Sequence, residues 1–243
     1  GSAEVVIGNT PPSLDGVELA PTEAFAGDTL VCTPGLASDV DGDPVTMRFE
    51  WTVDGVSMTE TTRNLGPEFF DKGQVVSCVV TPDDGIEAGQ ASASNPVTIS
   101  NTLPVLDGAT LSPDPATTTD TLTCTPGVAT DVDGDRITFA TAWTVDGVVS
   151  SETTDVLSAS EFSRDQLVGC TVTPSDDEAD GAPASTSLTV SNTPPTEPTI
   201  SVSPTDAIEG VDDLLCRVDV DATDADGDAP IYTISWSVDG TSH

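Results

Sequence analysis

Short runs of alternating apolar and polar residues recur along the chain and predict β-strands. The clearest run covers residues 45–53. Its apolar side chains occupy every second position: Val45, Met47, Phe49, Trp51 and Val53. A period of two, rich in β-branched and aromatic residues, is the pattern of a half-buried strand. No segment has a convincing helical period, and glycine and proline separate the runs. The pattern therefore predicts an all-β fold of short strands.

Comparable runs appear further along the chain and predict more inward-facing positions. The residues in inward phase are Ile137, Phe139, Trp143 and Val145; Val76, Cys78 and Val80; Val168, Cys170 and Val172; Val97 and Ile99; and Leu188 and Val190. Seven or so short strands in each stretch of about 92 residues indicate a β-sandwich.

The strand pattern repeats with a period of 92 residues, seen first in the spacing of Cys32, Cys124 and Cys216. Trp51, Trp143 and Trp236 follow nearly the same period, and each is followed by Val-Asp-Gly. Repetition at this scale predicts an array of small domains rather than one catalytic core. The predicted units are residues 1–8, the last strand of a preceding repeat; residues 9–100 and 101–191, two complete repeats; and residues 192–243, the N-terminal half of a third.

The third unit is predicted to hold only part of a sandwich, so its sheet needs further strands to pack against. Residues 192–243 carry the predicted strands through Trp236 but lack the last strands of the sandwich. Half a sandwich leaves a sheet face bare and its edges unpaired. We expect either further sequence or a neighbouring chain to cover it, and the segment from Val5 to Ile7 is the obvious donor strand in the second case. The first of these alternatives is favoured.

The charge of the chain limits its partners. Its 42 acidic residues face only six basic ones, which gives a formal net charge of −36. Such a surface repels nucleic acid and anionic membranes, so we expect neither as a partner. No run of 18 apolar residues is present, and we expect no membrane insertion. The acidity also fits adaptation to high salt.

The cysteines recur in pairs. Cys32 and Cys78 lie 46 residues apart, as do Cys124 and Cys170. One pair per unit at constant spacing predicts the disulfides Cys32–Cys78 and Cys124–Cys170, and therefore an oxidising, extracellular or cell-surface location. Buried free thiols are the alternative. Cys216 would need a partner beyond the end of the chain.

The order Cys, Trp, Cys resembles the immunoglobulin fold, in which a tryptophan packs against a disulfide that joins two sheets. Cys32, Trp51 and Cys78 fit these roles. Val76 stands where that family often has a tyrosine two residues before the second cysteine. The whole unit looks like the immunoglobulin-like, cadherin-like or polycystic-kidney-disease-type repeats of large bacterial surface proteins. The resemblance implies tandem immunoglobulin-like β-sandwich domains, two complete and one partial.

Acidic residues cluster in two kinds of loop, and they predict calcium sites. The string D-x-D-G-D alternates carboxylates around a glycine, which is a hard, oxygen-only ligand set suited to Ca²⁺. A second acidic cluster, Asp83-Asp84 in the first repeat and Asp176-Asp177-Glu178 in the second, belongs, by the immunoglobulin assignment, to another loop. That loop lies at the same pole as the Asn-Thr linker that opens each repeat, at Asn9 and Asn101. The candidate ligands are Asp39, Asp41, Asp43, Asp83 and Asp84; Asp131, Asp133, Asp135, Asp176 and Asp177; and Asp224, Asp226 and Asp228. A solvated acidic turn without an ion is the alternative.

Enzymatic chemistry finds little support in the sequence. The single histidine, His243, permits no nucleophile–histidine arrangement, and we expect no catalytic site. The leading hypothesis is a calcium-stabilised stalk or spacer of a secreted or surface-anchored bacterial protein, with neighbouring repeats as its main partners and short, stiff junctions at Asn101 and Asn192. The alternatives are a homo-oligomeric fibre completed by strand donation and a module that binds glycans or proteins.

Overall fold

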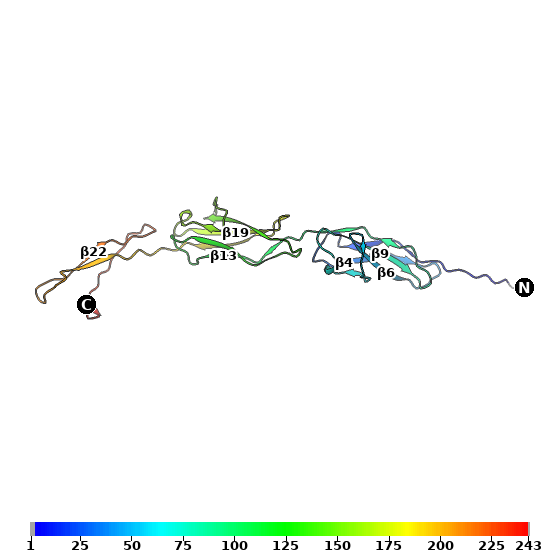
Figure 1. Cartoon of the computed structure of the whole chain (residues 1–243), viewed down its shortest axis with the longest axis horizontal. Helices are drawn as coiled ribbons and strands as arrows, with labels where there is room; N and C mark the ends of the chain where they lie inside the picture. Colours follow the sequence, from blue (N-terminus) through cyan, green and yellow to red (C-terminus); the bar gives the residue numbers. More distant parts are fainter. Residues whose placement is uncertain (1–2, 243) are drawn as a thin grey trace. The chain divides into compact units, whose positions relative to one another are not determined.

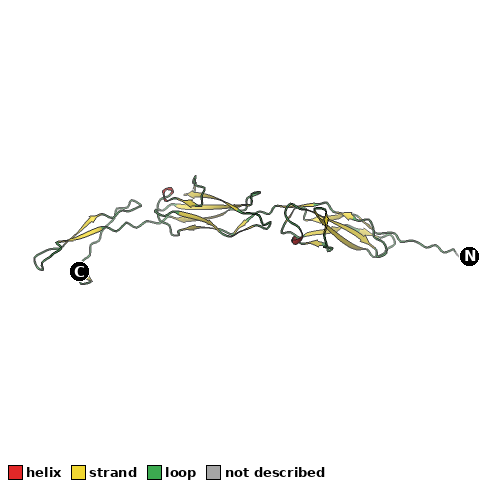
Figure 2. Ribbon diagram, in the orientation of Figure 1, coloured by secondary structure: helices red, strands yellow, loops and turns green. Residues whose placement is uncertain are grey.

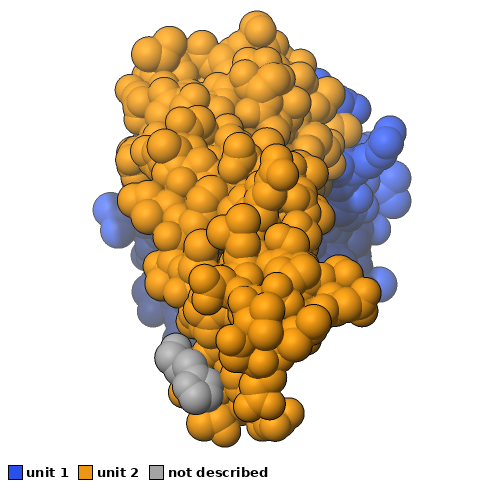
Figure 3. Space-filling model, turned by 90° about the vertical axis from the view of Figure 1, so that its left-hand side faces the viewer, with its two compact units in different colours: residues 1–105, 130–137, 175–180 blue, residues 106–129, 138–174, 181–243 orange. Residues whose placement is uncertain are grey.

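The structure is a computed structural model that describes residues 3–242. Within that range the regular elements are β-strands and two short 3₁₀ helices, without an α-helix (Figure 2). The chain divides into two compact units (Figure 3). Unit 1 holds the residues up to 105 together with 130–137 and 175–180, and unit 2 holds 106–129, 138–174 and the residues from 181 on. The acidic loops of the second repeat thus belong to unit 1.

Two sheets, antiparallel except for one strand pair, form the sandwich of unit 1 (Figure 1). The larger sheet has the order β3 (Ala24–Phe25), β11 (Val97–Ser100), β9 (Val75–Asp83), β6 (Thr46–Val53) and β7 (Val56–Ser57), with β10 (Ser92–Ala93) also on β9. In this sheet β11 runs parallel to β3. The smaller sheet is β2 (Val17–Ala20), β4 (Leu30–Pro34) and β8 (Asn64–Leu65). The pair β1 (Ser13–Leu14) and β5 (Ala37–Ser38) and the 3₁₀ helix η1 (Pro67–Phe69) complete it.

The core of this sandwich lies between the inward faces of β4, β6 and β9. Trp51 on β6 faces Cys78 on β9 across the antiparallel pair, and both are fully buried. Leu30 and Leu65 close the core from the smaller sheet. Burying one such aliphatic or aromatic side chain contributes about 1.5–3 kcal/mol. The apolar side chains predicted to face inward from residues 45–53 therefore do contribute to this core, as Met47, Phe49, Trp51 and Val53 show.

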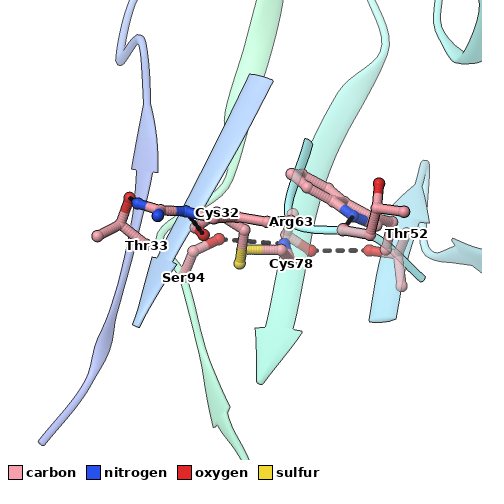
Figure 4. The surroundings of a disulfide bond; sticks show 9 residues. Cys32, Thr33, Thr52, Arg63, Cys78 and Ser94 are labelled. Atoms are coloured by element: carbon pink, nitrogen blue, oxygen red, sulfur yellow. Dashed lines mark hydrogen bonds between the residues drawn. A yellow bond between two sulfur atoms is a disulfide. The ribbon is translucent and has the colours of Figure 1, made fainter. Parts of the chain in front are cut away.

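A disulfide between Cys32 and Cys78 joins the two sheets, with an S–S distance of 2.10 Å (Figure 4). The backbone polar groups of both cysteines are hydrogen-bonded by nearby side chains. Ser94 Oγ accepts a hydrogen bond from the Cys78 amide at 3.2 Å, and Arg63 donates to the Cys32 carbonyl at 3.2 Å. The indole N–H of Trp51 donates to the Thr62 carbonyl at 2.9 Å. The predicted pairing of these cysteines is confirmed, and the polar part of the tryptophan is hydrogen-bonded despite its burial.

Unit 2 repeats the same plan with a smaller core. One sheet has the order β13 (Ala109–Ser112), β14 (Leu122–Pro126), β18 (Val156–Leu157), and the other has β17 (Val148–Val149), β16 (Thr138–Val145), β19 (Leu167–Ser175), β20 (Ala184–Thr189). The remaining elements near it are β12 (Val105–Leu106), β15 (Ala129–Thr130) and η2 (Ala159–Glu161). Cys124 on β14 and Cys170 on β19 form the second disulfide between sheets. Trp143 is fully buried, and its N–H donates to the Thr154 carbonyl at 2.8 Å.

The third repeat has strands but little core. Its strands are β21 (Thr199–Ser203), β22 (Leu215–Val220), β23 (Ser237–Val238) and β24 (Thr241–Ser242). The strand predicted to run through Trp236 is not formed there, which corrects that expectation. In the first repeat the equivalent strand β6 pairs along its whole length with β9, and no described strand takes that role here. Val202, Leu215 and Val220 consequently stay exposed.

Two further details differ from the sequence-based picture. Phe139 was expected to face inward, but it is 43% exposed because it stands near the start of β16, outside the buried cluster. Val5, Val6 and Ile7 are also exposed and belong to no strand among residues 3–242, so their role as a last strand stays a prediction. The predicted fold class, all-β with tandem immunoglobulin-like sandwiches, is confirmed. The described residues include no helix that is long and apolar enough to span a bilayer.

Candidate metal centre

The first acidic loop of unit 1 follows β5 and curls around Asp39. Oδ1 of Asp39 accepts hydrogen bonds from the amides of Asp41 at 2.8 Å and Asp43 at 3.2 Å. Gly42 adopts a φ of +85°, a backbone conformation that glycine reaches without steric cost. The loop thereby brings carboxylate oxygens of Asp39, Asp41 and Asp43 within 4.8 Å of one another.

The other oxygen of Asp39 has an unusual environment. Asp39 Oδ2 is buried and has no hydrogen-bond partner among the described residues. Leaving a buried charged oxygen unpaired is unfavourable, because the lost hydration is not replaced. A hydrogen-bond donor or a cation at Asp39 Oδ2 would therefore stabilise the loop.

The acidic loop of the second repeat has the same geometry, and it too lies in unit 1. Asp131 Oδ1 accepts from the amides of Asp133 at 2.8 Å and Asp135 at 3.3 Å. Asp131 Oδ2 is again buried without a hydrogen-bond partner among the described residues. Carboxylate oxygens of Asp131, Asp133 and Asp135 lie within 4.8 Å of one another. Two independent loops thus leave the same oxygen unsatisfied.

Acidic side chains also hold the Asn-Thr linker that opens each of these two repeats. In the first repeat the amide of Thr10 donates to Asp41 Oδ2 at 2.6 Å, and Asn9 Nδ2 donates to Asp84 Oδ2 at 2.9 Å.

In the second repeat the amide of Thr102 donates to Asp133 Oδ2 at 2.6 Å, and Asn101 Nδ2 donates to Asp176 Oδ2 at 2.8 Å. The middle carboxylate of the D-x-D-G-D string and one carboxylate of the second cluster therefore fasten the linker at the same place in both repeats.

The second acidic cluster is held mainly by protein donors. Backbone bonds from Glu87 and then the side chain of Asn9 lower the pKa of Asp84. Asn101, followed by backbone donors, lowers the pKa of Asp176.

Two other members of the second cluster differ from this pair. Asp83 is buried and forms an ion pair with Arg48, while Asp177 is exposed. Of the four, only Asp84 and Asp176 have a hydrogen bond to a linker asparagine among the described residues, and none of the four joins the two converging triads. Their role as metal ligands stays a prediction.

The third acidic string has a different set of partners in unit 2. Asp224 Oδ1 accepts from the amides of Asp226 at 2.8 Å and Asp228 at 3.2 Å, as in the other loops. Asp226 is engaged by the Thr118 hydroxyl at 2.5 Å and by the Thr193 amide at 2.6 Å. These three carboxylates are not among the converging groups found in residues 3–242.

Sequence reasoning missed the basic partner of the second loop. Lys72 Nζ donates to Asp135 Oδ2 and Glu178 Oε1, each at 2.5 Å, and these bonds raise its pKa. The available signal was its spacing of 92 residues from Arg164. Among the described residues, no basic side chain forms an ion pair with the first triad, Asp39, Asp41 and Asp43.

The two triads are suited to a hard cation. Two carboxylates about 4 Å apart repel by roughly 1 kcal/mol in water and about 4 kcal/mol at the lower effective dielectric of a protein surface. Calcium is bound by six to eight oxygens in a flexible geometry. The donor set and the unpartnered Oδ2 atoms therefore fit a divalent cation. His243, the one histidine, lies outside the described residues.

Comparison with known proteins adds only distant likenesses. No protein-family model matches the chain, and no curated protein does. Among solved structures, a two-domain fibronectin type III segment of chicken tenascin matches 73% of this chain and 99% of its own, with 9% identity and a TM-score of 0.39. The chicken interferon gamma receptor alpha chain matches 75% and 100%, with 12% identity and a TM-score of 0.40.

A bacterial ice-binding adhesin is also among the solved structures that resemble the chain. It matches 81% of this chain and 70% of its own, with 15% identity and a TM-score of 0.31. Identities and TM-scores this low transfer no function to the chain.

Proposed function

We propose that this chain is a non-catalytic, calcium-stabilised repeat segment that serves as a stalk or spacer of a secreted or surface-anchored bacterial protein. The tandem sandwiches support a structural role, because each carries its own core and its own disulfide. Disulfides persist in oxidising compartments, which supports an extracellular location. The neighbouring repeats of the same protein are the partners in this proposal.

One observation carries the calcium part of the proposal. Among residues 3–242, Asp39 Oδ2 and Asp131 Oδ2 are buried and find no hydrogen-bond partner, and each lies in a triad of converging carboxylates. A bound cation would satisfy this oxygen and also neutralise the repulsion within the triad. Asp39, Asp41 and Asp43 would hold one ion, and Asp131, Asp133 and Asp135 a second. The chemistry that calcium supplies here is charge neutralisation and bridging, without a reaction.

The location of the triads connects the ion to the proposed spacer role. The same loops fasten the linker amides of Thr10 and Thr102 through Asp41 and Asp133. An ion that orders these loops would also order the linkers. We therefore expect calcium to stiffen the start of each repeat, and a stiff start to each repeat is what a spacer requires.

Calcium titration of the full chain tests the proposal. The backbone amides of Gly42 and Gly134, followed by NMR, report on the two loops separately. Both should shift and reach half-saturation at about 1 mM calcium or below, the range of extracellular modules. Asp39→Asn should abolish the response at Gly42 alone, and Asp131→Asn the response at Gly134 alone.

The control is Asp114→Asn, which removes one exposed carboxylate outside the loops and should leave both responses intact. If neither glycine responds to calcium, or if both Asp→Asn changes leave the responses unaltered, the loops are solvated turns and the calcium proposal fails.

A further inference from the structure

Lys72 makes three contacts that unite the linker and both acidic loops of the second repeat. Its Nζ donates to Asn101 Oδ1 at 2.9 Å, in addition to Asp135 Oδ2 and Glu178 Oε1, each at 2.5 Å. All four residues belong to unit 1. An ammonium group has three N–H donors, so every donor of this lysine has an acceptor. The side chain is only 22% exposed, although it is charged.

Arg164 occupies the equivalent position 92 residues later and makes two of the three equivalent contacts in unit 2. Its Nη1 donates to Asn192 Oδ1 at 2.6 Å and also contacts Asp228 Oδ2. Asn192 opens the third repeat as Asn101 opens the second, and Asp228 ends the third D-x-D-G-D string as Asp135 ends the second. The basic residue differs between the repeats, but its partners correspond.

Basic residues are scarce in this chain, so the equivalent contacts of Lys72 and Arg164 are unlike those of ordinary surface charges. The chain has only six basic residues against 42 acidic ones. Two of these six occupy equivalent turns and contact equivalent partners. By contrast, Arg63 donates to the Cys32 carbonyl, and Arg217 is 76% exposed with a loose pair to Asp219 at 3.8 Å. A solvated surface charge needs no such repeated set of acceptors.

We propose that Lys72 and Arg164 are linker cations: side chains of one repeat that hold the Asn-Thr linker of the next repeat against its acidic loop. Each neutralises the last carboxylate of the loop and orients the linker asparagine, whose amide in the second repeat is bound by Asp176. The contact provides order at the linker when no metal is bound. It does not depend on the calcium proposal, because its atoms are all protein atoms.

Amide hydrogen exchange of the full chain in the presence of a chelator tests this inference. The reporter is the amide of Thr102, which donates to Asp133 Oδ2 next to the Lys72 contacts. In Lys72→Gln the exchange of the Thr102 amide should accelerate by about fivefold or more. This factor corresponds to the free energy of one net hydrogen bond. Lys72→Arg, which introduces the residue of the following repeat, should retain the protection. Arg164→Gln should accelerate exchange at Thr193 instead.

Two controls keep the result specific. The amide of Thr10 makes the same bond to Asp41 in the first loop, which no basic side chain contacts within residues 3–242, and it should not respond to Lys72→Gln. Arg217→Gln makes the same change in net charge and should leave Thr102 unaffected. Equal exchange of Thr102 in Lys72→Gln and Arg217→Gln would overturn the inference. Unchanged exchange of the buried indoles of Trp51 and Trp143 verifies that the two sandwiches of the variants remain folded.

Discussion

Asn9 Nδ2 donates a hydrogen bond of 2.9 Å to Asp84 Oδ2, and the pair recurs 92 residues later as Asn101 and Asp176 at 2.8 Å. The two asparagines differ in one respect. The carbonyl oxygen of Asn101 also accepts from Lys72, whereas no comparable bond to Asn9 occurs among the described residues. The chain therefore contains the same contact with and without a basic partner.

This difference predicts unequal costs for the two asparagines. Asn101→Ala removes two side-chain hydrogen bonds, and Asn9→Ala removes one. At about 1 kcal/mol for each net hydrogen bond, Asn101→Ala should lower the free energy of unfolding by roughly twice as much as Asn9→Ala. Urea unfolding followed by tryptophan fluorescence measures both. Equal losses would show that the Lys72 contact adds nothing to stability.

The disulfides should carry a large share of the stability of each sandwich. Replacing Cys32 and Cys78 together by serine opens a loop closed over 46 residues. The chain-entropy model assigns such a loop about 4 kcal/mol, which is a large part of the 5–15 kcal/mol typical of a folded protein. Thermal unfolding of the double variant should show one transition at markedly lower temperature. Cys216→Ser changes a free thiol and should leave both sandwich transitions unaltered, and a small effect of the double variant would contradict the prediction.

The two acidic triads should differ in calcium affinity if the proposed metal sites are correct. Lys72 Nζ contacts Asp135 in the second triad, and within residues 3–242 no basic side chain contacts the first. A positive charge at the last carboxylate opposes a second cation by Coulomb repulsion. We therefore expect Lys72→Gln to strengthen calcium binding at Gly134 by about tenfold, which corresponds to roughly 1.4 kcal/mol, with no change at Gly42.

NMR titration of the two glycine amides measures both affinities in one sample. Lys72→Arg serves as the control, since it keeps the charge and should keep the weaker affinity. A Lys72→Gln protein with unaltered binding at Gly134 would show that the ammonium and the metal do not interact.

Acid titration should separate Asp120 from ordinary carboxyls. The amide of Thr117 donates to Asp120 Oδ2 at 2.7 Å and its hydroxyl at 2.8 Å. These bonds favour the ionised form and lower the pKa of Asp120 below its usual value of 3.8. A depressed pKa means that the carboxylate stabilises the fold above pH 3.8, and that this contribution is lost as the pH falls through the lower folded value.

Side-chain carbon shifts of Asp120 followed against pH measure this pKa. Thr117→Ala removes the hydroxyl but keeps the amide, so the pKa should move only part of the way back. Thr121→Ala, at an exposed position of the same segment, should have no effect. A return to the usual value in Thr117→Ala would mean that the backbone bond contributes nothing.

The sequence by itself determined the long strands of the first two repeats, the repeat period and the cysteine pairing. These are local or periodic properties: alternation in residues 46–53 needs only the two-residue period of a strand, and the pairing of Cys32 with Cys78 follows from their constant spacing and the fold it resembles. The Asp-Gly turns after each tryptophan are equally local, since Asp54 and Asp146 adopt the positive φ of 50° that such hairpins require.

Only the tertiary structure decided which polar groups meet. The D-x-D-G-D string marks three equal candidates in the sequence, yet two triads converge with a buried oxygen, while the carboxylates of Asp226 and Asp228 are engaged by Thr118 and Arg164. Likewise, Lys72 meets Asp135 across 63 residues and Glu178 across 106. Such contacts depend on how separate strands end at one pole of a sandwich. No short-range sequence pattern specifies where the strand ends lie relative to one another, because their positions result from the packing of both sheets around their common core.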